Sequence, residues 1–172
     1  MHALFLMLAC NGSPTPSATE PSPPSPQVVE GKTSPKRNVV IISLDTVSAE
    51  HMALFGGPAT TPNIASIAAQ GATWTAITHF PETAVAHWSL MTGVLPAVHG
   101  DVPAYGTSRY TGPTLAEHLK TQGYRTAAFI GGETLTDRST GLSRGFDVYD
   151  DKHRWDRADL KRPGREVTAS AL

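Results

Sequence analysis

The feature that most constrains the fold is an apolar run from Val39 to Leu44, in which Ser43 is the only polar residue. Strict alternation of apolar and polar residues would indicate a strand with one face in solvent, whereas a continuous run indicates a strand covered on both faces. Such strands belong to sheets that carry helices on both sides. The run ends at Asp45, so the sequence places a carboxylate at the carboxyl end of the predicted strand.

Two helices and a further strand are predicted downstream. Residues 61–71 begin with a threonine N-cap and a proline at the first helical position, and end with a glycine stop at position 71. Residues 114–122 begin with the capping-box spacing of Thr114 and Glu117. Residues 124–130 are predicted to form another strand, closed by two glycines. Strands that alternate with helices predict an α/β fold with a mostly parallel sheet flanked by helices.

The N-terminal segment differs in character from the rest. Residues 1–10 contain a short apolar run that ends at Cys10, which resembles a bacterial lipoprotein signal, although no Lys or Arg precedes the run. The alternative is a frayed apolar N-terminus with a chance cysteine. The lipoprotein reading predicts a lipidated Cys10, membrane attachment through the lipid, and a place in the bacterial cell envelope, either lipid-anchored or periplasmic or extracellular.

Residues 11–36 are predicted to be a disordered tether, because they hold half of the 14 prolines among Ser and Thr. We therefore expect the folded domain to comprise residues 37–172. Residues 163–172 look like the start of another helix without a stop signal, so we expect the chain to end inside an element.

Composition excludes several classes of partner and anchor. The formal net charge of −1 provides no basic excess, so nucleic acid is not an expected partner. No apolar run reaches the roughly 18 residues of a membrane span. A single cysteine allows no intrachain disulfide.

Three residues are candidates for a catalytic or metal-binding role, although each could instead be an ordinary turn or helix residue. Asp45 at a strand end is a suitable ligand for a divalent cation, or a turn residue. Thr83 is predicted to start a helix over residues 83–92, where the dipole favours an alkoxide, and His87 lies one turn further along. Taken without further context, Thr83 is more often a plain N-cap and His87 a helix-surface histidine. His99 follows in a Pro/Gly turn, which favours a structural role.

Taken together, the segments resemble sulfatases of the alkaline phosphatase superfamily. The matching segments occur in the family's order and spacing: Val39–Thr46, Thr61–Ile64, Ser89–Gly93 with His99–Gly100, Gly123–Ala127, and Gly141–Asp151. The resemblance covers residues 37–172 and implies an alkaline-phosphatase-like α/β fold, truncated relative to the longer members of the family.

The resemblance also implies roles for the candidate residues. Asp45 falls on the family's first metal-binding aspartate. Thr83 falls on the position of the nucleophile, which is also a metal ligand. His87 falls on the arginine of the family's signature sequence around the nucleophile. Val85 and Ala86 replace the usual Pro and Ser. Threonine cannot be converted to the formylglycine of many sulfatases, so Thr83 would attack directly.

The implied cofactor is a divalent cation (Ca, Mg, Zn or Mn), and the implied substrate is a small anionic ester. The family's late Asp and His ligands have no counterpart here, so we expect an inactive fragment of a sulfuric ester hydrolase. The segment Gly131–Glu133 lacks the Lys and His of many true sulfatases. A phosphodiesterase- or phosphatase-like relative, a non-catalytic surface-anchored anion-binding module, and a pseudogene product without function remain alternatives.

Overall fold

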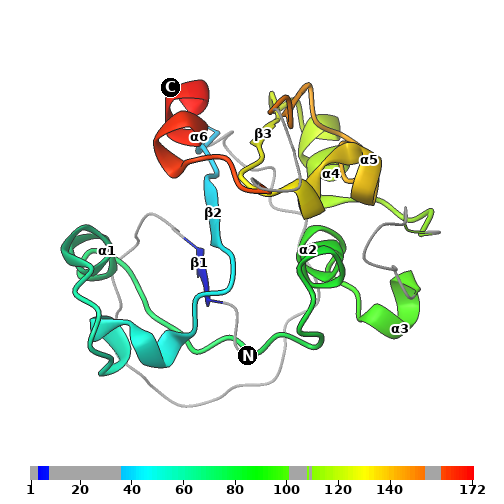
Figure 1. Cartoon of the computed structure of the whole chain (residues 1–172). Coiled ribbons are helices and arrows are strands. Elements are labelled where there is room, and N and C mark those ends of the chain that lie inside the picture. The colour runs from blue at the N-terminus through cyan, green and yellow to red at the C-terminus, as the bar shows by residue number, and fades with distance from the viewer. Residues whose placement is uncertain (1–3, 8–35, 101–107, 109, 154–159) are drawn as a thin grey trace, which may run out of the picture. The chain divides into compact units, whose positions relative to one another are not determined.

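The computed structural model describes residues 4–7, 36–100, 108, 110–153 and 160–172. The chain divides into two compact units, one extending to Ala76 and the other running from Ile77 to Leu172 (Figure 1). Cys10, and the predicted tether apart from Lys36, lie outside the described residues. The lipid anchor and the disordered tether therefore stay predictions.

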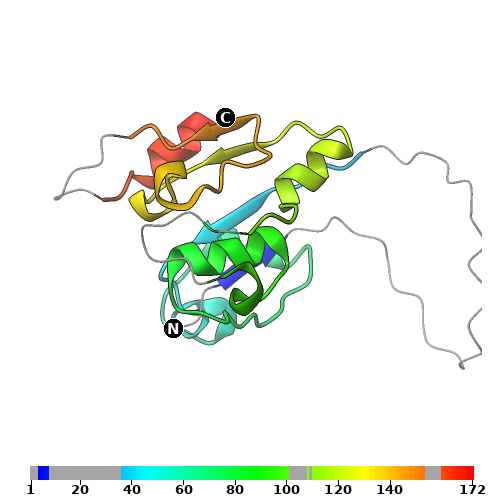
Figure 2. The same cartoon turned by 90° about the vertical axis from the view of Figure 1, so that its right-hand side faces the viewer.

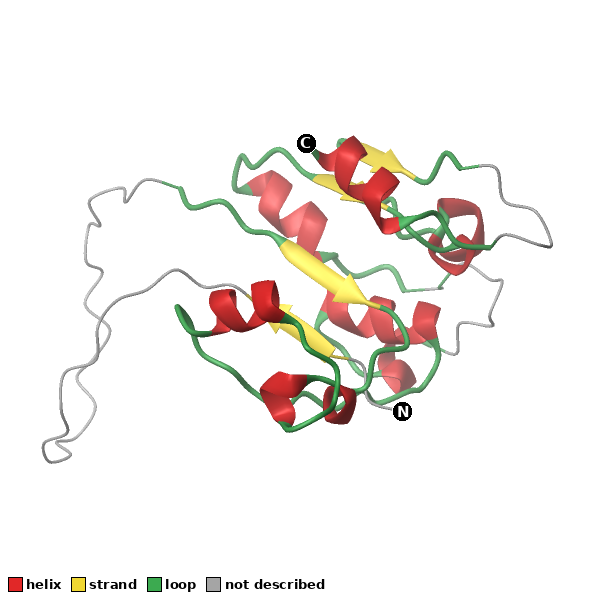
Figure 3. Cartoon of the chain, turned by 60° about the vertical axis from the view of Figure 1, so that its left-hand side comes forward, coloured by secondary structure: helices red, strands yellow, loops and turns green. Residues whose placement is uncertain are grey.

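The first unit contains an antiparallel pair of strands, β1 (Leu4–Met7) and β2 (Ile41–Leu44) (Figure 3). The predicted strand exists, but the prediction that it is covered on both faces is wrong for the described chain. The side chains of Val40 and Ile42 are 62% and 55% exposed. In the described part of the chain β2 pairs with β1 and with no other strand. A strand is buried on both faces only when neighbouring strands flank it and helices cover it. An apolar run indicates that such cover is needed, but it does not show which residues provide it.

After β2 the chain forms two 3₁₀ helices, η1 (Ala49–His51) and η2 (Ala53–Phe55), and then α1 (Pro62–Ala68). Pro62 occupies the first helical turn as predicted, but the hydroxyl of Thr61 makes no capping hydrogen bond. The helix ends before Gly71, because Ala69 closes it in a right-handed conformation and no left-handed glycine is needed.

The second unit contains a parallel pair, β3 (Ala127–Phe129) and β4 (Val148–Asp150), which confirms the parallel connection but gives a shorter strand than predicted. An isolated antiparallel bridge joins Gly132, which follows β3 in the chain, to Lys161. Helix α6 (Gly164–Ala171) follows and packs on β3 (Figure 2). The described residues thus form two small two-stranded sheets, and the parallel pair with its helices has the local construction of an α/β fold.

The core of the second unit forms around α2 (Thr83–Thr92). Four other elements of this unit lie near it: α3 (Pro96–His99), α4 (Leu115–Thr121), η3 (Glu133–Leu135) and α5 (Asp137–Thr140). Trp88 is 1% exposed and donates its indole N–H to the carbonyl of Thr140 at 3.2 Å. Leu142 and the half-buried Tyr149 complete the cluster. The helix that carries the candidate site is therefore fixed by its buried face.

Helix α4 has the predicted capping box, with both reciprocal hydrogen bonds between Thr114 and Glu117. Among the helices of the described ranges, none has the length and apolar character that crossing a membrane requires.

Candidate functional site

Thr83 is the first residue of α2, as the sequence predicts, and Glu82 is the N-cap. The helix ends at Gly93, which adopts a left-handed conformation with φ of 70°. The first intrahelical bond joins the N–H of Ala86 to the carbonyl of Glu82. The side chain of Thr83 thus lies at the positive end of a ten-residue helix, where negative charge on an oxygen is stabilised.

The structure brings His87 and Thr83 together. The Nδ1 atom of His87 lies 2.7 Å from the backbone carbonyl oxygen of Thr83, and both residues are half-buried. A carbonyl oxygen only accepts hydrogen bonds, so Nδ1 must carry the proton. The Nε2 atom then accepts a hydrogen bond when the ring is neutral and donates one when the ring is an imidazolium.

Asp45 lies in the first unit, directly after β2, at the strand end where the sequence places it. Its neighbour Thr46 has a φ of 61°, a left-handed conformation that β-branched residues rarely adopt. The structure thus brings together Thr83 and His87, but Asp45 belongs to the other unit.

A metal site of three or more His, Cys, Asp or Glu side chains is not found in the described ranges of the chain. A divalent cation generally takes about six oxygen ligands, and Asp45 with Thr83 would supply two. The described residues therefore do not by themselves fit a complete divalent-cation site.

His99 is 1% exposed, and its Nε2 atom lies 2.9 Å from the hydroxyl of Ser89 on α2. Its ring lies 6.5 Å from the ring of Trp88. The sequence favours a structural turn histidine at this position. Its burial and its contact with α2 fit that role.

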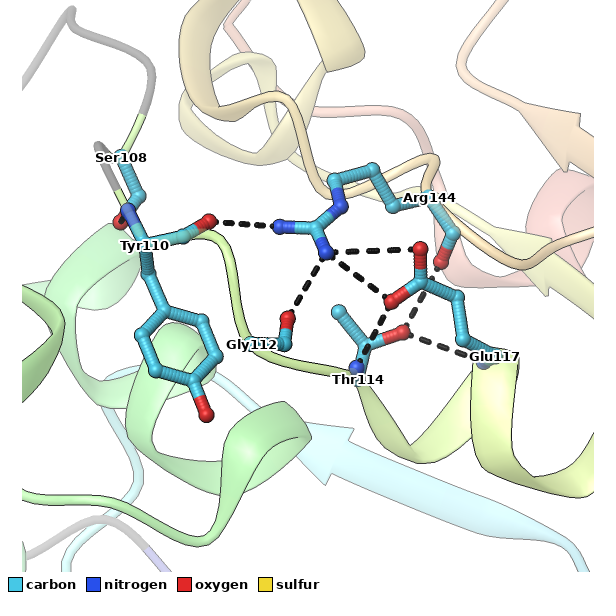
Figure 4. A network of polar contacts seen from close by, with 6 residues as sticks. All are labelled: Ser108, Tyr110, Gly112, Thr114, Glu117 and Arg144. Atoms are coloured by element: carbon cyan, nitrogen blue, oxygen red, sulfur yellow. Dashed lines mark hydrogen bonds and ion pairs between the residues drawn. The ribbon is translucent and has the colours of Figure 1, made fainter.

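Arg144 ties α4 to the segment that precedes it (Figure 4). Its guanidinium donates to the carbonyls of Tyr110 and Gly112 at 2.7 and 2.8 Å, and to the carboxylate of Glu117 at 3.0 Å. The backbone N–H of Thr114 holds the pKa of Glu117 below its ordinary value, and Arg144 lowers it further. Glu117 therefore stays ionised to a lower pH than an ordinary glutamate.

Two carboxylates at β4, Asp147 just before the strand and Asp150 at its end, are also stabilised as anions. Lys120 and the backbone N–H of Thr126 lower the pKa of Asp147 to about 2, and Arg162 lowers that of Asp150. Burial raises the pKa of Tyr149, whose hydroxyl donates to the carbonyl of Leu135 at 2.7 Å. These groups serve the packing of the second unit.

The family model described as sulfatase matches residues 37–166 of this sequence. The chain belongs to the sulfatase family. Membership places it in the alkaline phosphatase superfamily and implies an α/β fold, with which the small parallel sheet agrees. None of the curated proteins and none of the solved structures matches the sequence at a significant level.

Sulfatases are hydrolases that act on esters, generally with a divalent metal ion. The chain is therefore sulfatase-like at the level of its family. The match includes Asp45, Thr83 and His87, the three residues singled out from the sequence.

Sequence reasoning missed the tertiary roles of Ser89 and Arg144. Both residues lie in segments that resemble the family, Ser89–Gly93 and Gly141–Asp151, so the resemblance could have marked them as candidates. Their partners, His99 and the 110–112 carbonyls, are 10 and 32 to 34 residues away in the chain. No helical or strand period links residues across such separations.

Proposed function

We propose that this chain carries the nucleophile of a hydrolase for small anionic esters, with the hydroxyl of Thr83 as the attacking group. The observation that carries the proposal is the pairing at the start of α2. Thr83 occupies the first helical position, and the imidazole of His87 is held over the same turn by its bond to the Thr83 carbonyl. Family membership supplies the reaction class.

In the proposed reaction, Thr83 Oγ1 forms a bond to the sulfur or phosphorus atom as the bond to the leaving oxygen breaks, and the proton that Thr83 loses ends, by way of solvent water, on the leaving oxygen to give the alcohol. Water then releases the anion from the threonine. A hydroxyl nucleophile needs its proton removed and the developing charge stabilised. The dipole of α2 favours the alkoxide, and an imidazolium at His87 steadies the anionic oxygens through Nε2–H.

Asp45 is the carboxylate that we propose as this chain's ligand for a divalent cation, together with Thr83. The cation would neutralise substrate charge, and its identity among Ca, Mg, Zn and Mn is open. Because these two residues alone do not complete a site, we expect the 172-residue chain to turn over substrate poorly or not at all.

Phosphate esters are an alternative substrate class to sulfate esters. A direct threonine nucleophile needs no formylglycine, and Gly131–Glu133 offers no Lys or His for a sulfate group. Comparing 4-nitrophenyl sulfate, 4-nitrophenyl phosphate and bis(4-nitrophenyl) phosphate at equal concentration distinguishes the classes.

The direct test replaces Thr83 by Ala. If the chain has measurable activity, Thr83→Ala is expected to lower turnover about 10²- to 10⁴-fold, the usual scale for losing a nucleophile or its activation. Thr73→Ala is the matched control, because Thr73 is exposed. Measurable activity that is equal in Thr83→Ala and wild type would exclude this nucleophile.

A non-catalytic anion-binding module is the second candidate function. Val85 and Ala86 stand where the signature has Pro and Ser, and the described residues offer no complete metal site. This candidate predicts that inorganic vanadate raises the melting temperature of the chain without any turnover. Thr83→Ala would then retain most of the vanadate effect, whereas His87→Ala would lose it.

The proposed location is the bacterial cell envelope, through a lipid on Cys10. The apolar run before Cys10 and the proline-rich segment after it support this proposal. Cys10→Ser is expected to move the protein from the membrane fraction to the soluble fraction of expressing bacteria. An unchanged distribution would count against the anchor.

A further inference from the structure

A side-chain hydrogen bond attaches the C-terminal half of α2, at the half-buried Ser89, to the buried His99 of α3. Ser89 Oγ lies 2.9 Å from His99 Nε2, and His99 Nδ1 lies 3.1 Å from the carbonyl oxygen of Gly100. His99 is 1% exposed, so its own ring has little access to water.

The two contacts determine the state of the ring. The Gly100 carbonyl only accepts, so Nδ1 carries a proton. An imidazolium would be a buried cation, and the hydrogen bonds found for His99 pair it with no carboxylate among the described residues. The neutral ring follows, and its Nε2 atom accepts the hydrogen bond that the hydroxyl of Ser89 donates.

His99 is itself held from two sides. Its ring lies 6.5 Å from the ring of Trp88, the most deeply buried large side chain of α2. Its backbone carbonyl accepts a hydrogen bond from Ser108 Oγ at 2.9 Å, and Ser108 Oγ accepts the N–H of Tyr110. The carbonyl of Tyr110 in turn accepts from Arg144 (Figure 4). The pair is therefore continuous with the network that ties down α4.

We propose that His99, as a neutral Nδ1–H imidazole, is a positioning residue for the site at the start of α2. Ser89 lies six residues after Thr83, about 9 Å along the helix axis. The helix is a continuous hydrogen-bonded rod, so fixing its distal half at Ser89 fixes the direction in which Thr83 and His87 are presented. The effect of this positioning on catalysis rests on the proposed role of Thr83. The positioning of α2 by His99 does not depend on that role.

The test uses the ¹⁵N-labelled 172-residue chain and nuclear magnetic resonance of its imidazoles and amides. In the wild type, His99 is expected to show a protonated Nδ1 and an unprotonated Nε2. Ser89→Ala is expected to lower the folding equilibrium constant about tenfold. It should also shift the Thr83 amide and His87 imidazole resonances.

His99→Gln is the conservative variant, because its side-chain oxygen can accept from Ser89. In His99→Gln the Thr83 and His87 resonances are expected to stay close to their wild-type positions. In His99→Leu, which cannot accept a hydrogen bond from Ser89, they are expected to shift. His118→Gln makes the same change at an exposed position on α4 and should leave these resonances in place. Ser89→Ala keeps the test valid if His99→Leu fails to fold.

A doubly protonated His99, or Ser89→Ala with wild-type Thr83 and His87 resonances, would overturn the proposal. Vanadate titration separates it from the proposed function. If the resonances move as expected but vanadate binds neither the wild type nor Ser89→Ala, the positioning role stands and the anion site does not.

Discussion

The guanidinium of Arg144 illustrates how much of the second unit depends on single polar groups. It satisfies two backbone carbonyls that lie outside any helix or strand, and it neutralises the glutamate of the α4 capping box. A lysine could not reach all three partners, because its ammonium is a point donor on a flexible stem. Loop carbonyls of this kind need a fork-shaped donor.

Asp147 makes the stability of the second unit depend on pH in the acid range. Lys120 Nζ lies 2.6 Å from its carboxylate, and Thr126 donates its backbone N–H at 3.0 Å. The pKa of Asp147 falls from 3.8 to about 2. A carboxylate with a depressed pKa stabilises the folded state fully above its ordinary pKa, and this contribution is lost as the pH falls through the folded value.

We therefore expect the wild type to lose this contribution between about pH 4 and pH 2, whereas Asp147→Asn lacks it at every pH. Urea unfolding at pH 7, 4 and 2 measures the difference between the two proteins. That difference should be largest at pH 7 and shrink toward pH 2. Glu166→Gln, at an exposed position on α6, is the control. A difference that stays constant with pH would contradict the assignment.

At the scale of elements, helices with local signals were predictable. The α2 bounds, its glycine stop and the α4 capping box follow from residues within four positions of each other, and the structure has all three. The end of α1 was predicted wrongly: Gly71 was expected to stop the helix, but the helix ends at Ala68. Ala69 closes it with backbone hydrogen bonds to Ala65 and Ile67, and the presence of a nearby glycine does not reveal this. The contact of Ser89 with His99 depends on how α2 packs against α3, which no local pattern encodes.

Gly145 joins two elements by close approach. Its φ is +85°, and a Cβ atom at this position would lie 2.3 Å from the backbone nitrogen of Glu117. The obstacle is the backbone of α4, which cannot move as a flexible side chain would. Gly145→Ala should therefore combine left-handed strain with a steric clash.

We expect Gly145→Ala to lower the free energy of unfolding by more than about 2 kcal/mol. Gly93→Ala is the matched control, because Gly93 also has a positive φ, of 70°, and no atom lies within 4 Å of its added Cβ. The control should cost about 1 kcal/mol, the strain alone. Equal losses in the two variants would show that the approach to α4 is looser than 2.3 Å.

At the scale of the whole molecule, the family and the α/β class could be predicted from the sequence, but the surroundings of β2 could not. An apolar run shows that a strand requires cover, and it does not show which residues provide it. Val39, Val40 and Ile42 remain more than half exposed, although their sequence is that of a buried strand. The same limit applies to Asp45, which follows this strand, because no local pattern shows which other residues would join it in binding the proposed cation.

The exposed apolar residues in and just before β2, which are Val39, Val40 and Ile42, predict self-association of the 172-residue chain. An open strand edge with β-branched apolar side chains is a template for pairing with another chain, and contiguous apolar surface adds to the driving force. Val40→Thr combined with Ile42→Thr keeps the β-branched shape of both side chains while removing apolar surface. Sedimentation velocity over a range of concentrations should show oligomers for the wild type and a larger monomer fraction for the double variant. Val148→Thr makes the same kind of change in β4, in the other unit, at a residue that is 47% exposed, and should leave the distribution as in wild type. A wild type that stays monomeric at all concentrations would show that β2 is covered in solution.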